Sequence, residues 1–166
     1  MTMIDIPQGV TVRIDGLKIS AKGPHGEVHK TLSKLVSVKV NGSKVDVVSE
    51  DKSLEGTTES IVKSMVHGVT SQYTRNLKLI YAHFPISIEV KGSDITVKNF
   101  LGEKQARKAR LVGSTKLQAK GQSVTVSGPD KEAVGQTIAN LRTAMKIKDK
   151  DSRIFQDGIY EVDGGA

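Results

Sequence analysis

The sequence contains no cysteine and no tryptophan. Without cysteine the chain can form neither a disulfide nor a cysteine-ligated zinc site, and it has no thiol nucleophile. Aromatic residues make up only 4 % of the chain, which leaves few rings for the exposed stacking platforms that bind single-stranded RNA. No apolar run approaches the roughly 20 residues of a membrane-spanning helix, so we expect no membrane partner. Residues 1–9 lack the basic and apolar regions of a signal peptide, and the sequence therefore predicts a cytoplasmic protein.

The common catalytic motifs are also missing. There is no Walker loop, no Gly-x-Ser-x-Gly elbow and no dinucleotide-binding glycine pattern. His25 and His29 lie four residues apart in a strand-like pattern, without a Glu at the metalloprotease spacing. Gly23-Pro-His-Gly26 has the length of the nucleotide-clamping loop of KH modules, but it follows a strand, so we interpret it as a plain turn. The sequence predicts a protein that is not an enzyme and that needs no cofactor, metal or small-molecule substrate.

Positive charge is concentrated in the C-terminal half of the chain. The formal net charge is +7 and the pI is about 9.6. Residues 98–153 contain 13 Lys or Arg against 5 Asp or Glu, a net charge of +8, whereas the rest of the chain has 12 against 13, a net charge of −1. The densest run, opposed only by Glu103, is Lys98, Lys104, Arg107, Lys108, Arg110, Lys116 and Lys120. A second cluster, interrupted by Asp149 and Asp151, is Arg142, Lys146, Lys148, Lys150 and Arg153.

This charge favours a polyanionic partner. Any one of these lysines is best read as a solvated surface charge, but +8 within one segment exceeds what solubility requires. With few aromatic residues available, contacts to the phosphates and 2′-hydroxyls of folded RNA are a more natural use of the charge than base stacking. Alternation along a strand at 104–111 would place Lys104, Lys108 and Arg110 on one face, with Arg107 on the other.

The sequence also contains an internal repeat. An offset of 76 residues pairs Gly16 with Gly92, Ile19 with Ile95, Lys22 with Lys98, Gly26 with Gly102 and Glu27 with Glu103. An offset of 79 pairs Gly42 with Gly121, Val45 with Val124, Val47 with Val126, Asp51 with Asp130 and Gly56 with Gly135. The matches fall at turns, strand cores and a helix start, which indicates a duplication. The change of offset implies a length difference of three residues between residues 27 and 42 and their counterparts.

Both copies read as strands followed by a helix. In the first copy, alternating segments 10–14 and 17–21 flank Asp15-Gly16, and 36–40 and 45–48 flank Asn41-Gly42-Ser43, which are hairpin signals. A helix is then predicted from Ser53 to Leu79 by the spacing of Ile61, Val62, Met65, Val66, Val69, Tyr73 and Leu77. The second copy predicts strands at 86–90, 95–97, 104–111, 116–120 and 124–126. Its helix opens at Pro129-Asp130 and carries the stripe Val134, Ile138, Leu141 and Met145.

These patterns predict an α+β fold of two tandem duplicated domains, each a mostly antiparallel sheet packed with one main helix. We place the first repeat at residues 1–81, the second, basic and RNA-facing repeat at 82–145, and a C-terminal tail at 146–166. The tail is too apolar for a free end, so we expect it to dock on RNA or on a neighbouring protein. Its apolar residues are Ile154, Phe155, Ile159, Tyr160 and Val162.

Three segments of the chain carry a resemblance to a known family. They are Tyr81-Ala-His-Phe-Pro-Ile86, Asn99-Phe-Leu-Gly-Glu-Lys104 and Lys148-Asp-Lys-Asp-Ser-Arg-Ile-Phe-Gln-Asp-Gly-Ile-Tyr160. Together they resemble protein six of the large ribosomal subunit, in its archaeal and eukaryotic form. The resemblance covers essentially the whole chain, and the three motifs together are highly specific. The family has two duplicated α+β domains, in agreement with the repeat found above.

The resemblance implies a structural ribosomal protein that binds large-subunit ribosomal RNA in the cytoplasm. It implies a position near the sarcin–ricin loop, the stalk base and the factor-binding region, beside the ribosomal proteins of the stalk base. Carried over by motif, the RNA-binding residues are Asn99, Gly102, Lys104, Lys148, Lys150, Arg153 and Asp157. Charge alone adds Lys98, Lys108, Arg110, Lys116 and Lys120.

One segment departs from the family pattern. Where the family has Gly-Val-Thr-Lys-Gly-Phe, this chain has Gly68-Val-Thr-Ser-Gln-Tyr73, so we expect the helix to survive and to run longer. Two other interpretations stay open at this point. One is a free RNA- or DNA-binding module outside the ribosome, which charge and fold alone suggest. The other is an enzyme that clamps an anionic substrate on the basic strand, although the sequence offers it no nucleophile or base.

Overall fold

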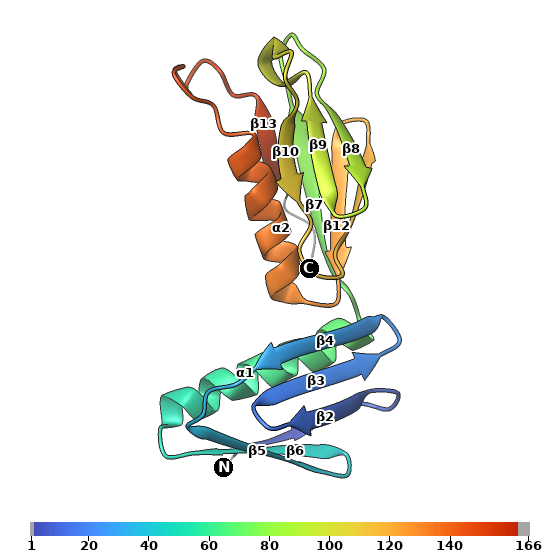
Figure 1. Cartoon of the computed structure of the whole chain (residues 1–166), viewed down its shortest axis with the longest axis vertical. Helices are drawn as coiled ribbons and strands as arrows, with labels where there is room; N and C mark the ends of the chain where they lie inside the picture. The colour runs from blue at the N-terminus through green and yellow to red at the C-terminus, as the bar shows by residue number, and fades with distance from the viewer. Residues whose placement is uncertain (1, 163–166) are drawn as a thin grey trace. The chain divides into compact units, whose positions relative to one another are not determined.

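The computed structural model describes residues 2–162 and divides into two compact units (Figure 1). The first unit comprises the chain up to Gln72 together with the short segment Pro129–Lys131, and the second begins at Tyr73. The boundary predicted from the sequence was at residue 81. Each unit has a hydrophobic core of its own, and the two sets of buried residues do not overlap. The elements of each unit are described separately below.

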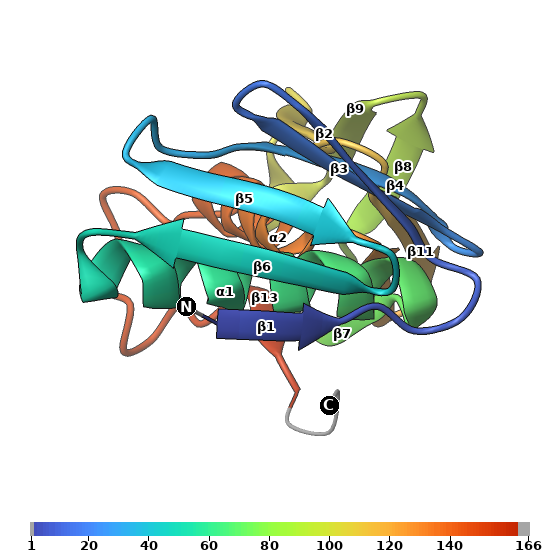
Figure 2. The ribbon, with the colours of Figure 1, turned by 90° about the horizontal axis from the view of Figure 1, so that it is seen from below.

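The first unit consists of two antiparallel three-stranded sheets and one helix. β2 (Thr11–Asp15), β3 (Lys18–Gly23) and β4 (Gly26–Thr31) form one sheet in that order. β1 (Thr2–Asp5), β6 (Lys44–Ser49) and β5 (Val36–Asn41) form the other. Figure 2 shows β1, β6 and β5 side by side, with α1 (Lys52–Thr70) behind them. Both predicted hairpins of this copy are confirmed by the pairing of β2 with β3 and of β5 with β6.

The helix α1 is shorter than the sequence predicted. Its N-terminus is capped by Asp51, whose Oδ1 accepts hydrogen bonds of 2.8 Å from the backbone N–H and the hydroxyl of Ser53. It ends at Thr70, because Ser71 already has an extended backbone with φ −136° and ψ 113°. The prediction of a helix up to Leu79 is therefore wrong, and so is the expectation that the departure at Ser71 lengthens it.

A strand takes the place of the predicted end of that helix. β7 (Tyr73–Ile80) buries Leu77 and Leu79 and exposes Lys78 and Ile80. Tyr73 and Leu77 are four residues apart, a spacing that places them on one face of either a helix or a strand. The alternation of apolar and polar residues in Leu77-Lys78-Leu79 is the strand signal that the helical interpretation overlooked.

The second unit repeats the plan of two sheets and a helix. β8 (Ser87–Lys91), β9 (Asp94–Lys98) and β10 (Arg107–Arg110) form a sheet in the order β10-β9-β8. β11 (Lys116–Lys120), β12 (Ser123–Gly128), β7 and β13 (Gly158–Glu161) form a sheet in the order β11-β12-β7-β13. α2 (Lys131–Ala144) contributes Val134, Ile138 and Leu141 to the core. All strand pairs described in both units are antiparallel, which confirms the predicted α+β fold.

The strand registers locate the three-residue difference between the copies. In the first copy Lys18 pairs with Thr31, and in the second Asp94 pairs with Arg110, so the offset has already changed from 76 to 79 within this hairpin. The extra residues therefore lie in the β9–β10 connection, residues 99–106, and not after residue 27 as predicted. The sequence match of Gly26 with Gly102 is consequently not a structural equivalence.

The end of the chain belongs to the second unit. β13 pairs with β7 so that Ile159 lies opposite Leu79, and Ile159 is only 5 % exposed. The predicted docking tail thus contributes one of its apolar residues to this unit's own core, while four remain exposed: Ile154, Phe155, Tyr160 and Val162. Residues 163–166 of that tail lie outside the described residues. Among the helices described, none is both long enough and apolar enough to cross a membrane.

Candidate nucleic-acid interface

The β9–β10 connection is a rigidly held loop. Three of its residues have a positive φ angle: Asn99 (59°), Leu101 (53°) and Gly102 (74°). The Nδ2 of Asn99 donates a hydrogen bond of 3.1 Å to the carbonyl of Pro85. A Cβ added to Gly102 would lie 3.0 Å from the Phe84 ring, so that position requires glycine both for its backbone angle and for lack of space. The resemblance nominated Asn99 and Gly102 as RNA-binding residues, and the structure gives both a role in holding the loop.

Arg107 connects this loop to the end of α2. Its Nε and Nη2 donate to the two carboxylate oxygens of Glu103 at 2.8 and 2.6 Å. Its Nη1 donates to the carbonyls of Ala144 and Lys146 at 2.9 and 2.8 Å. The guanidinium also lies 4.5 Å from the centre of the buried Phe100 ring. The hydrogen bonds from Arg107 lower the pKa of Glu103, and those to Glu103 raise the pKa of Arg107.

Two of the predicted lysines come together beside Arg107. Lys108 of β10 and Lys148, which follows α2, line one depression of about 440 Å³. Ala109 is buried and Lys108 is exposed, in keeping with strand alternation. Neither lysine belongs to an ion pair among the described residues. These two ammonium groups are therefore available to an external anion.

Lys104 is exposed but does not extend the row of charges on β10. The strand begins at Arg107, so the predicted strand 104–111 is too long and Lys104 lies in the loop before it. Its position is set by the loop contacts of Asn99 and Arg107 and not by strand alternation.

The segment between α2 and β13 presents charge next to exposed apolar groups. The Nζ of Lys150 lies 4.7 Å from the centre of the Phe155 ring. Arg153 donates from Nε and Nη2 to Asp151 at 3.1 and 3.0 Å, and these bonds lower the pKa of Asp151. The Arg153 side chain nevertheless stays 88 % exposed, and Ile154 is 75 % exposed. This surface combines cations with apolar area, as an RNA- or protein-contacting segment requires.

Other predicted residues are less available. Lys98 pairs with Glu89 at 2.7 Å, which lowers the pKa of Glu89. Arg110 lies 3.6 Å from Asp94, although its side chain is 84 % exposed. Asp157 is buried, and as a carboxylate it is not suited to contact phosphate. Lys116 and Lys120 are exposed but lie on β11, in the other sheet of the unit.

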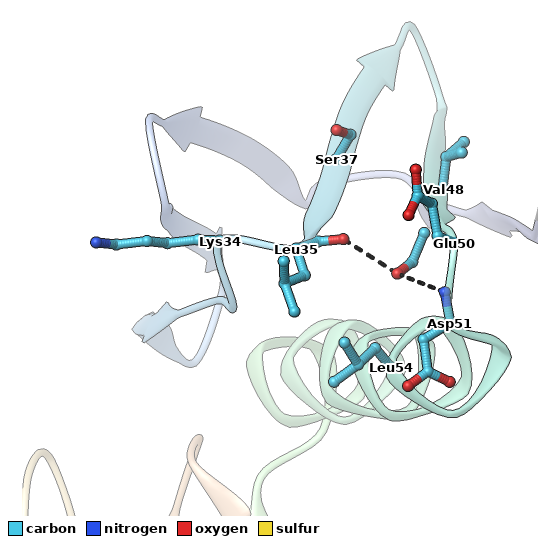
Figure 3. Close-up of a pocket in the computed structure, with 8 residues that line it drawn as sticks. Lys34, Leu35, Ser37, Val48, Glu50, Asp51 and Leu54 are labelled. Atoms are coloured by element: carbon cyan, nitrogen blue, oxygen red, sulfur yellow. Dashed lines mark hydrogen bonds between the residues drawn. The ribbon is translucent and has the colours of Figure 1, made fainter.

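The first unit offers a depression of a different kind. It has a volume of about 500 Å³ (Figure 3). Its lining combines the apolar Leu35, Val48 and Leu54 with two acids, Glu50 and Asp51, one cation, Lys34, and two serines, Ser37 and Ser49. Leu35 and Val48 are 73 % and 46 % exposed. Carboxylates beside apolar side chains disfavour a phosphate ligand, so this depression is not a candidate for RNA binding. Within the described residues no cluster of His, Cys, Asp and Glu could hold a metal ion.

The comparisons with known proteins agree with this picture. The family model described as ribosomal protein L6 matches residues 6–72 and again residues 84–158. The chain belongs to the ribosomal protein L6 family. The two matched segments of this L6 chain correspond to the two copies of the internal repeat.

Similar L6 proteins span nearly the same length. A protein of Methanocella arvoryzae named large ribosomal subunit protein uL6 is 42 % identical over 164 residues, covering 95 % of this chain and 93 % of the relative. The uL6 proteins of Staphylothermus marinus and Methanobrevibacter smithii are each 42 % identical, covering 98 % and 96 % of this chain and 93 % of each relative. These names describe ribosomal proteins and not enzymes, in agreement with the non-enzymatic role predicted from the sequence.

The contact of Arg107 with the end of α2 was not predicted from the sequence. Strand alternation predicted only that the Arg107 side chain points away from that of Lys108, as the structure shows. The two carbonyls that accept hydrogen bonds from Arg107 belong to Ala144 and Lys146, which lie 37 and 39 residues further along the chain. No local pattern announces such a contact, because it depends on how β10 packs beside the end of α2.

Proposed function

We propose that this chain is a structural constituent of the large ribosomal subunit that binds large-subunit ribosomal RNA through its second unit. Family membership and the names of its relatives support the ribosomal role. The observation that carries the RNA-binding surface is the convergence of Lys108 and Lys148 at one depression, with Lys104 in the adjoining loop.

Binding at this surface works by neutralising phosphates. Lysine ammonium groups and arginine guanidinium groups displace counterions from the RNA backbone, which makes affinity depend steeply on salt. The proposed contact residues are Lys104, Lys108, Lys148, Lys150 and Arg153. Lys98 and Arg110 can join them by exchanging Glu89 and Asp94 for phosphate. Asn99 and Gly102 hold the loop, and Asp157 stays inside the unit.

The finer location follows from the family resemblance. We propose that the chain lies near the sarcin–ricin loop, the stalk base and the factor-binding region, next to the ribosomal proteins of the stalk base, in the cytoplasmic ribosome. Exposed Ile154, Phe155 and Val162 supply an apolar surface for RNA sugars or for such a neighbour. Hydroxyl-radical footprinting of large-subunit RNA with and without the chain would identify the protected helices, and protection confined to other regions would refute this placement.

The RNA-binding role is tested with the full chain and protein-free large-subunit RNA. Affinity is measured over a range of salt concentrations for the wild type and for Lys148→Gln/Lys150→Gln/Arg153→Gln. Each lost phosphate contact reduces the magnitude of the slope of log K against log salt by about one. We therefore expect the slope of the triple variant to be shallower than that of the wild type by about two to three. The control is Lys18→Gln/Lys22→Gln/Lys39→Gln, which removes the same charge from exposed positions of the first unit. Equal slopes for the two triple variants would show that these residues do not contact RNA.

A further inference from the structure

The outward side of the four-stranded sheet β11-β12-β7-β13 forms a continuous polar surface, here called the outer sheet face. Strand alternation defines it, because Leu117, Val124, Val126, Leu77 and Ile159 all point into the core. The positions between them point the other way. The outer sheet face consists of Lys116, Gln118, Lys120, Ser123, Thr125, Ser127, Thr74, Asn76, Lys78, Ile80 and Tyr160.

The strand registers arrange these side chains in rows across the sheet. Lys120 lies opposite Ser123, Ser123 opposite Lys78, and Lys78 opposite Tyr160. A second row runs from Gln118 through Thr125 to Asn76, and a third from Lys116 through Ser127 to Thr74. Thr125 Oγ1 donates to Asn76 Oδ1 at 3.2 Å, which confirms that neighbouring strands present these groups on one side.

No carboxylate belongs to the outer sheet face. In the four strands the single acidic residue is Glu161. It lies opposite the buried Leu77 and is 3.7 Å from Arg75, whose alternation also places it on the core side. The outer sheet face thus carries three lysines, and its other polar groups are hydroxyls and amides. This differs from the β8-β9-β10 sheet, where Glu89 and Asp94 accompany the cations.

The duplication provides an internal comparison for this surface. In the first unit, β5, β6 and β1 have the equivalent register, so that Asp5 lies opposite Lys44 where Lys78 lies opposite Ser123. Likewise Asp46 stands at the position of Thr125, and Met3 at that of Asn76. The equivalent face of the first unit carries Lys39 and Lys44 against Asp5 and Asp46, a net charge of zero. Of these two acids Asp5 is exposed, whereas Asp46 is buried and accepts a hydrogen bond from Nδ2 of Asn41. The fold therefore tolerates acids at these positions, and the net charge of +3 on the second face is not a requirement of folding.

We propose that the outer sheet face is a second RNA-binding surface of this chain, which receives the sugar–phosphate backbone of an RNA helix. The inference rests on the proposed function. It adds Lys78, Asn76, Thr125 and Tyr160 to Lys116 and Lys120, all on a different sheet from Lys108 of β10. The Tyr160 hydroxyl donates to the Gln156 carbonyl at 3.0 Å, so its oxygen can accept a hydrogen bond from a 2′-hydroxyl.

The side chains on this surface are those that contact nucleic-acid backbones. Phosphate and sugar oxygens accept hydrogen bonds from Lys, Ser, Thr, Asn, Gln and Tyr without reading sequence, and 2′-hydroxyls both donate and accept. Lys78 and Lys120 share a row and are separated by one strand, so their attachment points are about 10 Å apart. Lys116 lies four residues from Lys120 on the same strand, about 13 Å away. Such spacing lets each ammonium group contact a different phosphate.

The first experiment compares two variants that lose the same charge. Lys78→Gln/Lys120→Gln removes two cations from the outer sheet face, and Lys39→Gln/Lys44→Gln removes two from the equivalent face of the first unit. Affinity of the full chain for protein-free large-subunit RNA is measured against salt concentration. We expect Lys78→Gln/Lys120→Gln to reduce the magnitude of the slope of log K against log salt by about two. We expect Lys39→Gln/Lys44→Gln to leave that slope unchanged. Equal slopes for both variants overturn the inference.

This result is separable from a failure of the proposed function. If the wild type binds the RNA and Lys148→Gln/Lys150→Gln/Arg153→Gln lowers its slope, while Lys78→Gln/Lys120→Gln does not, only the outer sheet face is refuted. If the wild type shows no salt-dependent binding at all, the proposed function fails and the inference fails with it. Far-UV circular dichroism and thermal melting establish that each exposed-site variant is folded.

A second experiment uses the absence of cysteine. Ser123→Cys places a single thiol between Lys120 and Lys78 on the outer sheet face, and Ser37→Cys places one on the equivalent face of the first unit. Each variant is labelled with a thiol-directed photo-crosslinker and incorporated into large subunits. We expect Ser123→Cys to crosslink to ribosomal RNA in at least tenfold higher yield than Ser37→Cys. Comparable yields, or crosslinks from Ser123→Cys to protein alone, would contradict the proposed surface.

Discussion

Among single residues, Arg107 connects the loop, the core and the end of the helix of the second unit. It contacts Glu103 in the loop, the Phe100 ring in the core, the carbonyl of Ala144 at the last residue of α2, and the carbonyl of Lys146 just beyond it. The Ala144 carbonyl belongs to the last turn of α2 and has no partner within the helix, so a guanidinium is well suited to satisfy it. Arg107 thereby holds the start of the basic segment that contains Lys148.

Removing the Arg107 side chain should destabilise the second unit. We expect Arg107→Ala to lower the free energy of unfolding by about 1–3 kcal/mol, since charged hydrogen bonds are lost at a partly exposed site. Lys108→Ala is the matched control on the same strand, and a change within about 0.5 kcal/mol is expected there. Urea unfolding followed by circular dichroism measures both, and similar losses for the two variants would show that the Arg107 contacts contribute little.

The Glu103–Arg107 pair also makes a prediction about pH. Arg107 lowers the pKa of Glu103 below its ordinary value of 4.5, so the pair contributes stability above that pH. The contribution is lost as the pH falls through the lower pKa of the folded state. The stability difference between the wild type and Arg107→Gln should therefore be constant above about pH 5.5 and should narrow below about pH 4.5. Denaturant unfolding at a series of pH values would test this. A stability difference between the two proteins that increases as the pH falls would contradict the prediction.

At the scale of elements, the two copies use the same framework with different connections. The β3–β4 turn contains only two residues between Gly23 and Gly26, whereas residues 99–106 connect β9 to β10. A Cβ on Gly23 would lie 2.8 Å from the Val69 carbonyl oxygen, so the β3–β4 hairpin packs directly against the end of α1. The longer loop of the second copy instead carries Phe100 into the core and Lys104 to the surface.

Equivalent glycines in the two helices offer a test of this correspondence. Gly56 in α1 and Gly135 in α2 are exposed, and a Cβ at either position would meet no atom within 4 Å. Gly56→Ala and Gly135→Ala should each stabilise the chain by about 0.5–1 kcal/mol. Gly23→Ala should destabilise it by about 1–3 kcal/mol, because its Cβ meets Val69. The melting temperatures of the three variants, each compared with that of the wild type, test these expectations. A Gly23→Ala protein that melts at the wild-type temperature would show that the close packing around Gly23 relaxes easily.

At the scale of the whole molecule, one fold serves two chemically different units. Their buried clusters are built from equivalent residues, such as Val47 and Val126, which are both fully buried. Their surfaces have diverged. The outer sheet face of the second unit carries three lysines and no carboxylate, while the matching face of the first carries two lysines, the exposed Asp5 and the buried Asp46. Duplication preserved the core and left the surface free to change.

Two separate cores predict two separable unfolding events. Val47→Ala and Val126→Ala should each destabilise their own unit by about 2 kcal/mol. Hydrogen exchange measured residue by residue should then show faster exchange in β5 and β6 for Val47→Ala, and in β11 and β12 for Val126→Ala. A uniform increase across both units after either substitution would mean that the chain unfolds as one cooperative body.

The duplication, the class of fold, the two hairpins of the first copy and the basic character of the C-terminal half can all be predicted from the sequence. These features arise from local alternation, turn residues and composition, which act between near neighbours. The sequence did not determine where α1 ends, because Tyr73 and Leu77 fit two periodicities until Leu77 and Leu79 pack into the second core.

Which of the positive charges are available to an external anion depends on the tertiary structure. Lys98 and Arg110 meet acids from an adjacent strand, Arg107 turns to the end of α2, and Lys108 comes beside Lys148. The pairing of β7 with both β12 and β13 likewise brings Lys78 next to Tyr160, and its register places Glu161, the one acid of the four strands, opposite the buried Leu77. Such neighbours are distant in the chain, and their spacing depends on register and packing, which no local pattern encodes.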